Sequence, residues 1–332
     1  LALARRTLPD AVPVVPCPLD LPGAIGRFFD AARPRALVVV ETELWPEMLH
    51  QAEKRGVPAA LVNARLSDGS FRGYHRVRRL LEPLLSPLTI VLARSPSDGE
   101  RFSALGVTPS AIRVTGNIKY DLEPDAAALP WAEAVQAAAG DRPVVVAGST
   151  MEGEEEIVLD AVSKCAAAGR PIFLILAPRH PERFDTVADL VLERSLGLIR
   201  RSTGSAPDAA TEVFLVDTIG ELARAYQLAH IAFIGGSLAP TGGHNPLEPA
   251  VWGVPVLSGP HVHNFREVYD EMTEAGGARL VADGAELRVA AAVWLADPGL
   301  ARAAGEAGRN VVERNRGATR RTVDALLGLL ET

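Results

Sequence analysis

Short aliphatic runs alternate with amphipathic stretches along almost the whole chain. Such runs predict buried strands, and apolar positions three and four residues apart between them predict helices. The pattern therefore predicts an α/β fold. The expected strands are 12–15, 36–40, 58–62, 89–92, 112–115, 143–147, 171–176, 197–200, 212–216, 231–234 and 254–257. The expected helices lie near 21–32, 46–55, 74–85, 97–105, 153–168, 182–194, 218–228, 246–252 and 264–275, and further helices between 285 and 330 end the chain.

The chain of 332 residues exceeds one ordinary hydrophobic core and indicates two domains. Alternating strands and helices predict parallel sheets with helices on both faces, and ligands then bind beyond the carboxyl ends of the strands. We expect a first domain at 1–120, a linker with one helix at 121–141, a second domain at 142–310, and a C-terminal helix at 311–332 that packs back on the first domain.

Composition narrows the class of protein. Hydrophobic residues make up 48% and charged residues 23%, which is typical of a globular protein, and the net charge of -7 argues against general nucleic-acid binding. Cys17 and Cys165 lack metal-ligand spacing and fit a reduced, cytosolic protein. The sequence shows no membrane-spanning run and no signal peptide. Residues 1–8 resemble the end of a helix, so we expect that an N-terminal piece precedes them.

Residues 231–257 are the most informative segment. A strand runs into a turn with two glycine pairs, 235–236 and 242–243, and then into a helix that is expected to open at Asn245. Glycines let backbone N–H groups approach an anion, and a helix start presents unpaired N–H groups. A nucleotide phosphate could meet the helix start while the carboxylate of Glu248 bridges two ribose hydroxyls.

The same segment also fits a plain helix start. Asn245 suits an N-cap, Pro246 the first helical position, and Glu248 the acidic position of a capping box. A simple cap needs neither glycine pair, so the pairs favour a ligand.

Three more motifs follow predicted strands of the second domain. Ser149 and Thr150 precede a helix with Glu152, Glu154, Glu155 and Glu156, whose acids we expect to decorate the helix N-terminus. The small residues could hold phosphate, as could Gly236 and Ser237. Arg179, held between prolines, could contact a base or phosphate. The third motif is Asp217 to Leu222.

The first domain offers two further candidates. Glu41 and Glu43 follow the strand at 36–40, and Lys119 follows the strand at 112–115. As alternatives, Glu43 can simply favour a helix start while Trp45 packs, and most lysines are solvated. Arg72, Arg76 and Arg79 gather on an amphipathic stretch that suits an anionic lipid surface equally as well as a solvated helix face.

Five motifs together resemble the bacterial 3-deoxy-D-manno-octulosonic acid (Kdo) transferases, which transfer Kdo from CMP-Kdo to a lipid A precursor. The resemblance covers nearly the whole chain. It implies a GT-B architecture, in which two Rossmann-like domains with parallel sheets face a central cleft and the second domain holds the donor. The motifs are Glu-Thr-Glu-Leu-Trp-Pro (41–46), Asn-Ala-Arg-Leu-Ser (63–67), Gly-Asn-Ile-Lys-Tyr-Asp (116–121), Pro-Arg-His-Pro-Glu-Arg-Phe (178–184) and Gly-Gly-His-Asn-Pro-Leu-Glu (242–248).

The resemblance also implies roles for individual residues. Glu41 and Lys119 match transition-state stabilisers, with Glu41 offsetting positive charge at the anomeric carbon and Lys119 negative charge on the leaving phosphate. No metal and no cofactor are implied, and the location implied is the cytoplasmic face of the inner membrane. The positions that match the family's CMP site are Pro178, Arg179, Ile219, Gly220, Glu221, Asn245, Pro246, Leu247 and Glu248.

The sequence departs from the family at its front. The family's anchor helix and its Ser-Val-Gly-Glu segment, which carries the general base, have no counterpart here, so we expect a chain that binds donor and transfers poorly. The alternatives are a GT-B-shaped nucleotide-sugar epimerase, a transferase with another donor, and a non-catalytic nucleotide-sugar binding module.

Overall fold

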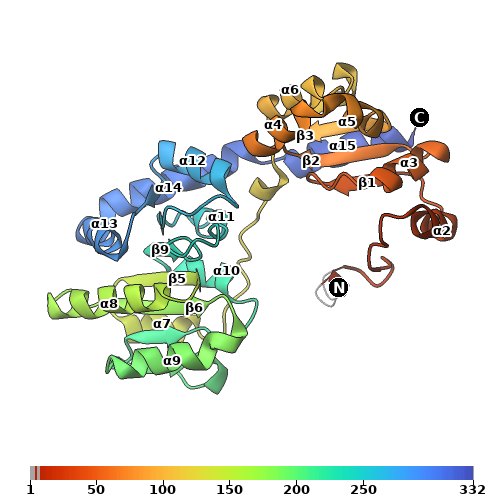
Figure 1. The fold of residues 1–332 in the computed structure, drawn as a ribbon. Helices are drawn as coiled ribbons and strands as arrows, with labels where there is room; N and C mark the ends of the chain where they lie inside the picture. Colours follow the sequence, from red (N-terminus) through yellow and green to blue (C-terminus); the bar gives the residue numbers. More distant parts are fainter. Residues whose placement is uncertain (1–3, 6–7, 332) are drawn as a thin grey trace. The chain divides into compact units, whose positions relative to one another are not determined.

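The computed structural model describes residues 4–5 and 8–331, and within them the chain forms two compact units. The first unit runs to Asp121 and takes up the chain again at Asn315, whereas the second unit is Leu122–Arg314. Each unit contains one parallel sheet (Figure 1). Most of the helix end expected at residues 1–8 lies outside the described residues.

The sheet of the first unit has four parallel strands in the order β1-β2-β3-β4. The strand expected at 12–15 is wrong. Val12 is 46% and Val15 57% exposed, and no strand forms there because Pro13 and Pro16 lack the N–H groups that a sheet requires. The strands are β1 (Leu37–Val40), β2 (Ala59–Ala64), β3 (Leu88–Ala93) and β4 (Ile112–Val114).

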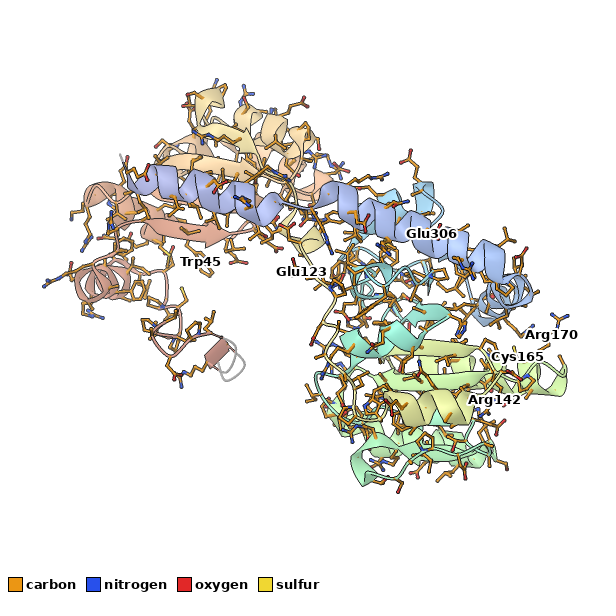
Figure 2. All side chains as sticks on the ribbon, turned by 180° about the vertical axis from the view of Figure 1, so that it is seen from behind. Trp45, Glu123, Arg142, Cys165, Arg170 and Glu306 are labelled. Carbon is orange, nitrogen blue, oxygen red and sulfur yellow. The ribbon has the colours of Figure 1, made fainter. Side chains whose placement is uncertain are left out.

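Helices cover both faces of this sheet. On one face the C-terminal helix α15 packs Ala325, Leu326 and Leu329 against β2 and β3, and in Figure 2 this blue-violet helix lies along the sheet. The carboxylate of Asp121 accepts the N–H groups of Gly317 (2.5 Å) and Thr319, which ties the start of α15 to this unit. The helices are α2 (Pro22–Ala32), α3 (Pro46–Lys54), α4 (Asp68–Arg76), α5 (Arg78–Leu85), α6 (Pro96–Ala104), η1 (Pro109–Ala111), η2 (Ile118–Tyr120) and α15 (Ala318–Leu330).

The sheet of the second unit has seven parallel strands in the order β11-β10-β9-β5-β6-β8-β7. The strand order reverses beside β5, because β6 lies on one side of it and β9 on the other (Figure 1). In sheets of this kind a ligand crevice opens beyond the carboxyl ends at the reversal. The strands are β5 (Val144–Thr150), β6 (Phe173–Pro178), β7 (Leu198–Arg200), β8 (Val213–Leu215), β9 (Ile231–Ile234), β10 (Val256–Ser258) and the unexpected β11 (Ala278–Leu280).

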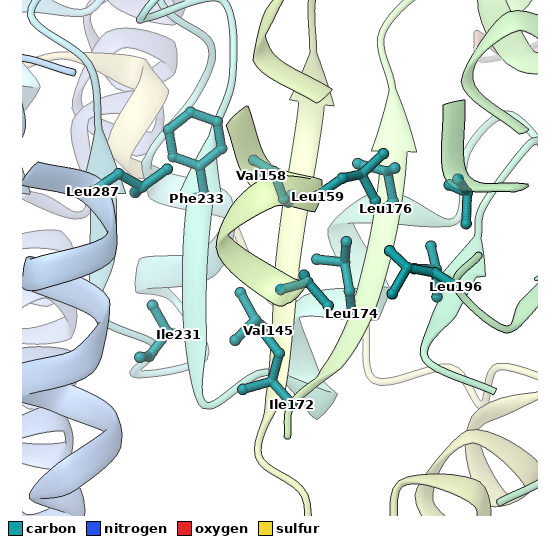
Figure 3. Close-up of a cluster of buried hydrophobic side chains, with 14 of the residues drawn as sticks. Val145, Val158, Leu159, Ile172, Leu174, Leu176, Leu196, Ile231, Phe233 and Leu287 are labelled. Carbon is teal, nitrogen blue, oxygen red and sulfur yellow. The ribbon is translucent and has the colours of Figure 1, made fainter. Parts of the chain in front are cut away.

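One face of this sheet is covered by α8, α9 and α13. Figure 3 shows aliphatic side chains of these helices with those of the central strands, for example Leu287 near Phe233, and Leu159 and Val145 belong to the same buried cluster. The helices are α7 (Ala132–Ala139), α8 (Glu154–Ala167), η3 (Pro181–Arg183), α9 (Phe184–Glu193), η4 (Arg201–Thr203), α10 (Leu222–Ala225), η5 (Tyr226–Leu228), α11 (Leu247–Ala250), α12 (Arg266–Glu274), α13 (Gly284–Ala296) and α14 (Pro298–Asn315).

The segment before β5 is packed into the second unit. Leu129 and Trp131 are buried, and the Trp131 ring lies 5.0 Å from that of Phe214. Its indole N–H donates to the carboxylate of Glu221 at 3.0 Å. Residues 129–139 therefore form part of the core of this unit.

Candidate functional site

A pocket of about 350 Å³ opens at the carboxyl ends of β5, β6 and β9, where the strand order reverses. Parallel strands end at the same edge of a sheet, so the residues that follow them converge there. Five residues singled out from the sequence line this pocket, namely Ser149, Arg179, Gly220, Asn245 and Glu248. It is completed by Leu222, Ala223, Tyr226, Ile234, His244 and Phe265.

Glu248 supplies the half-buried carboxylate of the pocket. Burial raises the pKa of Glu248, while a hydrogen bond from Asn245 and the positive charge of Arg179 partly offset that effect. The amide Nδ2 of Asn245 lies 3.5 Å from Oε1 of Glu248. A carboxylate with a free oxygen in a polar pocket is suited to accept hydrogen bonds from vicinal hydroxyl groups.

Arg179 and His244 are the two basic residues that line the pocket. The guanidinium of Arg179 is exposed beyond β6. Burial lowers the pKa of His244, and the Arg179 charge lowers it further, which favours a neutral imidazole. Arg179 is therefore the cation of this pocket that suits a phosphate.

Gly148, at the end of β5, leaves space for the pocket residue Tyr226. A Cβ at position 148 would lie 2.0 Å from the Tyr226 hydroxyl and 3.0 Å from Leu222 Cδ1, and the tyrosine is 1% exposed. We expect Gly148→Ala to lower the free energy of unfolding by about 1–3 kcal/mol, the usual cost of overpacking. Urea denaturation measures this change.

Two further variants separate the steric cause from general effects of alanine. Tyr226→Phe removes the clashing hydroxyl, so in its background the cost of Gly148→Ala should shrink. Gly73→Ala is the control, because nothing lies within 4 Å of a Cβ there. An equal loss of stability in both tyrosine and phenylalanine backgrounds would contradict the steric explanation.

The loop at 217–221 reaches the pocket only through Gly220. Ile219 is 83% exposed, and the carboxylate of Glu221 faces away, toward Trp131, Thr218 and Arg201. Burial favours a higher pKa for Glu221, but hydrogen bonds from Thr218 and Trp131 and the charge of Arg201 lower it on balance. Glu221 thus holds the loop in place and does not line the pocket.

The glycine-rich loop after β9 is already filled by a carboxylate. The N–H groups of Gly236 and Ser237 donate to Glu154 at 2.7 and 2.8 Å, so these two groups are not available to a phosphate. Glu154, Glu155 and Glu156 lie in the first turn of α8, as expected for acids at a helix N-terminus. Glu154 and Glu155 are nevertheless 1% and 0% exposed, so these two carboxylates are buried. Thr150 is likewise buried at 0% exposure.

The helix expected at 246–252 is a single turn. α11 comprises four residues from Leu247, and Pro246 precedes it, so the expectation of Pro246 as the first helical residue is off by one. The side chain of Asn245 accepts the N–H of Leu247 at 3.1 Å. A helix this short adds little dipole, so it is a poor phosphate site on its own.

In the first unit Glu41 and Lys119 meet at 3.2 Å between Oε1 and Nζ. They follow β1 and β4, the two edges of the sheet, and are brought together because residues 115–119 run back along its carboxyl end. Thr115 N–H bonds to Ala93 of β3, and Ile118 N–H bonds to Asn63 of β2 at 3.2 Å. Both side chains are half-exposed and can reach a ligand.

Asn63, which opens one of the recognised motifs, was not singled out from the sequence, yet its side chain holds the segment that carries Lys119. It is 1% exposed within β2, and its backbone has a φ of 51°. Glu41, at the end of the neighbouring strand, has a φ of 62°. Such conformations cost energy in non-glycine residues and gather at functional sites. The only signal of Asn63 in the sequence was the Asn-Ala-Arg-Leu-Ser motif.

Three arginines on α4 and α5 of the first unit lie on an exposed surface. Arg72 and Arg76 on α4 and Arg79 on α5 are exposed, and Leu80 beside them is 79% exposed. Trp45, labelled in Figure 2, is 42% exposed, which does not support the alternative in which this side chain packs.

Across residues 4–5 and 8–331, no three His, Cys, Asp or Glu side chains gather as a metal site. Nor does any helix in that part of the chain combine the length and apolar character needed to cross a bilayer.

Two parallel α/β sheets, one of them with a polar pocket beyond its strands, define the GT-B class of glycosyltransferase folds. The UDP-GlcNAc 2-epimerase of Neisseria meningitidis bound to UDP-GlcNAc shares this fold, with a TM-score of 0.59 at 15% identity over 92% of this chain and 79% of that one. At this identity the likeness shows the fold alone.

Sequence comparisons are more specific. Residues 1–122 match the family model of the 3-deoxy-D-manno-octulosonic-acid transferases (kdotransferases). The 3-deoxy-D-manno-octulosonic acid transferase of Haemophilus influenzae is 39% identical over 98% of this chain and 77% of its own length. That of Bordetella pertussis is 39% identical over 93% and 72%. The chain belongs to the 3-deoxy-D-manno-octulosonic acid transferase family and is a glycosyltransferase.

Proposed function

We propose that this glycosyltransferase moves Kdo from CMP-Kdo to a lipid A precursor in lipopolysaccharide core synthesis. The observation that carries the proposal is the 39% identity to a Kdo transferase over 98% of the chain. The pocket at the reversal of the second sheet supports it, since it offers a cation and a carboxylate for a nucleotide.

In this proposal the second unit holds the donor. Arg179 pairs with the phosphate as a fork of N–H donors, and Glu248 accepts two hydrogen bonds from the ribose hydroxyls. Gly220 lets the backbone approach the nucleotide at the rim of the pocket, where its φ of 93° suits glycine. Ile219, next to Gly220, contacts the nucleotide through its backbone, and Glu221 and the residues around Leu247 support the loops that carry these contacts.

Transfer is proposed as a direct displacement that inverts the anomeric carbon. The bond from that carbon to the CMP phosphate breaks, a bond to the acceptor hydroxyl oxygen forms, and the hydroxyl proton leaves to a base. Positive charge grows on the sugar and negative charge on the departing phosphate. Glu41 stabilises the first and Lys119 the second, as preset charges do in many active sites.

The acceptor is a lipid, so the protein works at a membrane surface. The exposed arginines 72, 76 and 79, together with Leu80, offer positive charge and apolar contact for anionic lipid at the cytoplasmic face of the inner membrane.

Nucleotide selectivity tests the donor assignment. Calorimetric titration should show CMP binding at least about tenfold more tightly than UMP or UDP, which corresponds to roughly 1.4 kcal/mol. UMP isolates the base, because it carries the same ribose and phosphate as CMP. A preference for UDP would overturn the donor and favour another nucleotide sugar.

A further inference from the structure

The glycine-rich loop of the second unit wraps around a single carboxylate from another element. Glu154, the first residue of α8, accepts backbone N–H groups of Ser237 at 2.8 Å, Leu238 at 2.8 Å and Ala239 at 3.3 Å through Oε1. Its Oε2 accepts those of Gly236 at 2.7 Å and Met151 at 2.9 Å. Four successive N–H groups of one loop therefore converge on one anion.

This carboxylate is buried without a cation. Glu154 is 1% exposed, and among residues 4–5 and 8–331 no Lys, Arg or His forms an ion pair with it. His244 interacts with it electrostatically, but burial lowers the pKa of His244 and favours the neutral imidazole. A buried charge is costly unless hydrogen bonds replace its water, and a concave run of backbone N–H groups is an anion site. The loop thus takes its shape around the Glu154 carboxylate as other proteins shape such loops around bound phosphate.

Hydrogen bonds connect this loop directly to the segment that carries the pocket residues. The carbonyl of Gly236 accepts the N–H of Gly243 at 2.7 Å and the Thr241 hydroxyl at 2.8 Å. The carbonyl of Gly235 accepts the N–H of His244 at 3.2 Å. Asn245 follows directly, and Glu248 stands one turn later, so the carboxylate that orders residues 236–239 also fixes where Asn245 and Glu248 stand.

The space at Gly235 shows how closely the loop and the carboxylate fit. A Cβ at position 235 would lie 2.4 Å from the carbonyl oxygen of Ser149 and 2.7 Å from Oε2 of Glu154. The loop therefore approaches the end of β5 and the start of α8 as closely as a backbone can.

We propose that Glu154 is a positioning residue that acts as a built-in anion for the nucleotide pocket. It takes the place that a ligand phosphate occupies in other glycine-rich loops, and it thereby leaves Arg179 to bind the donor phosphate. The inference rests on the proposed nucleotide site. It implies that a small free carboxylate can replace the side chain once Glu154 is shortened.

The test is chemical rescue of Glu154→Ala. CMP should bind this variant at least about tenfold more weakly, because the loop N–H groups are left unpaired. Formate or acetate should restore most of the affinity by entering the vacated space, whereas sodium chloride at the same ionic strength should not. In Glu154→Gln the amide fills that space, so weakened binding there should not respond to formate.

Glu152→Ala is the matched control, because that exposed acid precedes the same helix. It should bind CMP normally with or without formate. If Glu154→Ala is too unstable for titration, its melting temperature should rise with formate while that of Glu152→Ala does not.

Unchanged CMP affinity in Glu154→Ala, or weakened affinity and stability that formate leaves untouched, would overturn the built-in anion. The outcome is separable from that of the proposed function. If the unaltered chain prefers a nucleotide other than CMP, the donor assignment fails. The affinity for that other nucleotide, measured in Glu154→Ala with and without formate, still tests this inference.

Discussion

Replacing Lys119 by alanine is expected to slow the release of CMP from CMP-Kdo in the presence of lipid acceptor by about 10²–10³-fold, as loss of one preset charge does in other active sites. Glu41→Gln should slow it by a similar factor, since the amide keeps the shape but loses the charge. The two groups lie 3.2 Å apart, and in our proposal they act on opposite charges of one transition state. A single-turnover assay with labelled donor measures the step.

Binding measurements separate this role from a structural one. The main contacts to CMP belong to the second unit in our proposal, so Glu41→Gln should titrate with CMP as the unaltered chain does. Lys119→Ala, which loses a charge beside the phosphate, should lose far less in CMP affinity than in turnover. Lys54→Ala, an exposed lysine at the end of α3, is the control for loss of one positive charge. Normal turnover in Lys119→Ala and Glu41→Gln with intact folding would remove both residues from the mechanism.

The sequence predicted Glu41 and Lys119 as site residues but did not predict that they form a pair. Each residue was predicted individually because each follows a strand, where ligands bind in parallel sheets. Their contact was not predictable from strand order, because β1 and β4 are the two edges of the sheet. It depends on residues 115–119 running back past Asn63, and a buried asparagine with a φ of 51° leaves no periodic signal.

In the second unit the pocket residues were predictable from the parallel topology of the sheet, whereas the buried position of Glu154 was not. Arg179 and Glu248 stand just past strands, so parallel topology brings them together. Glu154 sits in a run of acids that reads as a solvated helix start, and only the loop after β9 reveals that it is buried. Such a partner is 82 residues away in sequence and therefore invisible to local patterns.

The strand wrongly expected at 12–15 illustrates the opposite error. Valines at 12, 14 and 15 satisfy the apolar pattern of a strand, but prolines at 13, 16 and 18 remove the N–H donors. Hydrogen bonding overrode hydrophobicity there. The seven strands of the second unit carry no such conflict, and of these strands only β11 was not expected from the sequence.

Glu248→Gln is expected to weaken CMP binding by about 10–100-fold, since a charged acceptor of two hydroxyl bonds is replaced by a neutral one. Comparison with 2′-deoxy-CMP localises the effect to the ribose. The unaltered chain should prefer CMP strongly over 2′-deoxy-CMP, and in Glu248→Gln this preference should largely vanish. Glu274→Gln, an exposed acid at the end of α12, should keep it.

The pH dependence of the same equilibrium gives an independent check. Burial raises the pKa of Glu248, so its carboxyl takes up a proton at a higher pH than an ordinary glutamate. Only the ionised form accepts both ribose hydroxyls, so CMP affinity should be full above that pKa and fall as the pH drops through it. The CMP phosphate titrates identically with both proteins, so the difference between the unaltered chain and Glu248→Gln isolates Glu248. Parallel pH profiles for the two proteins would show that this carboxylate does not hold the ribose.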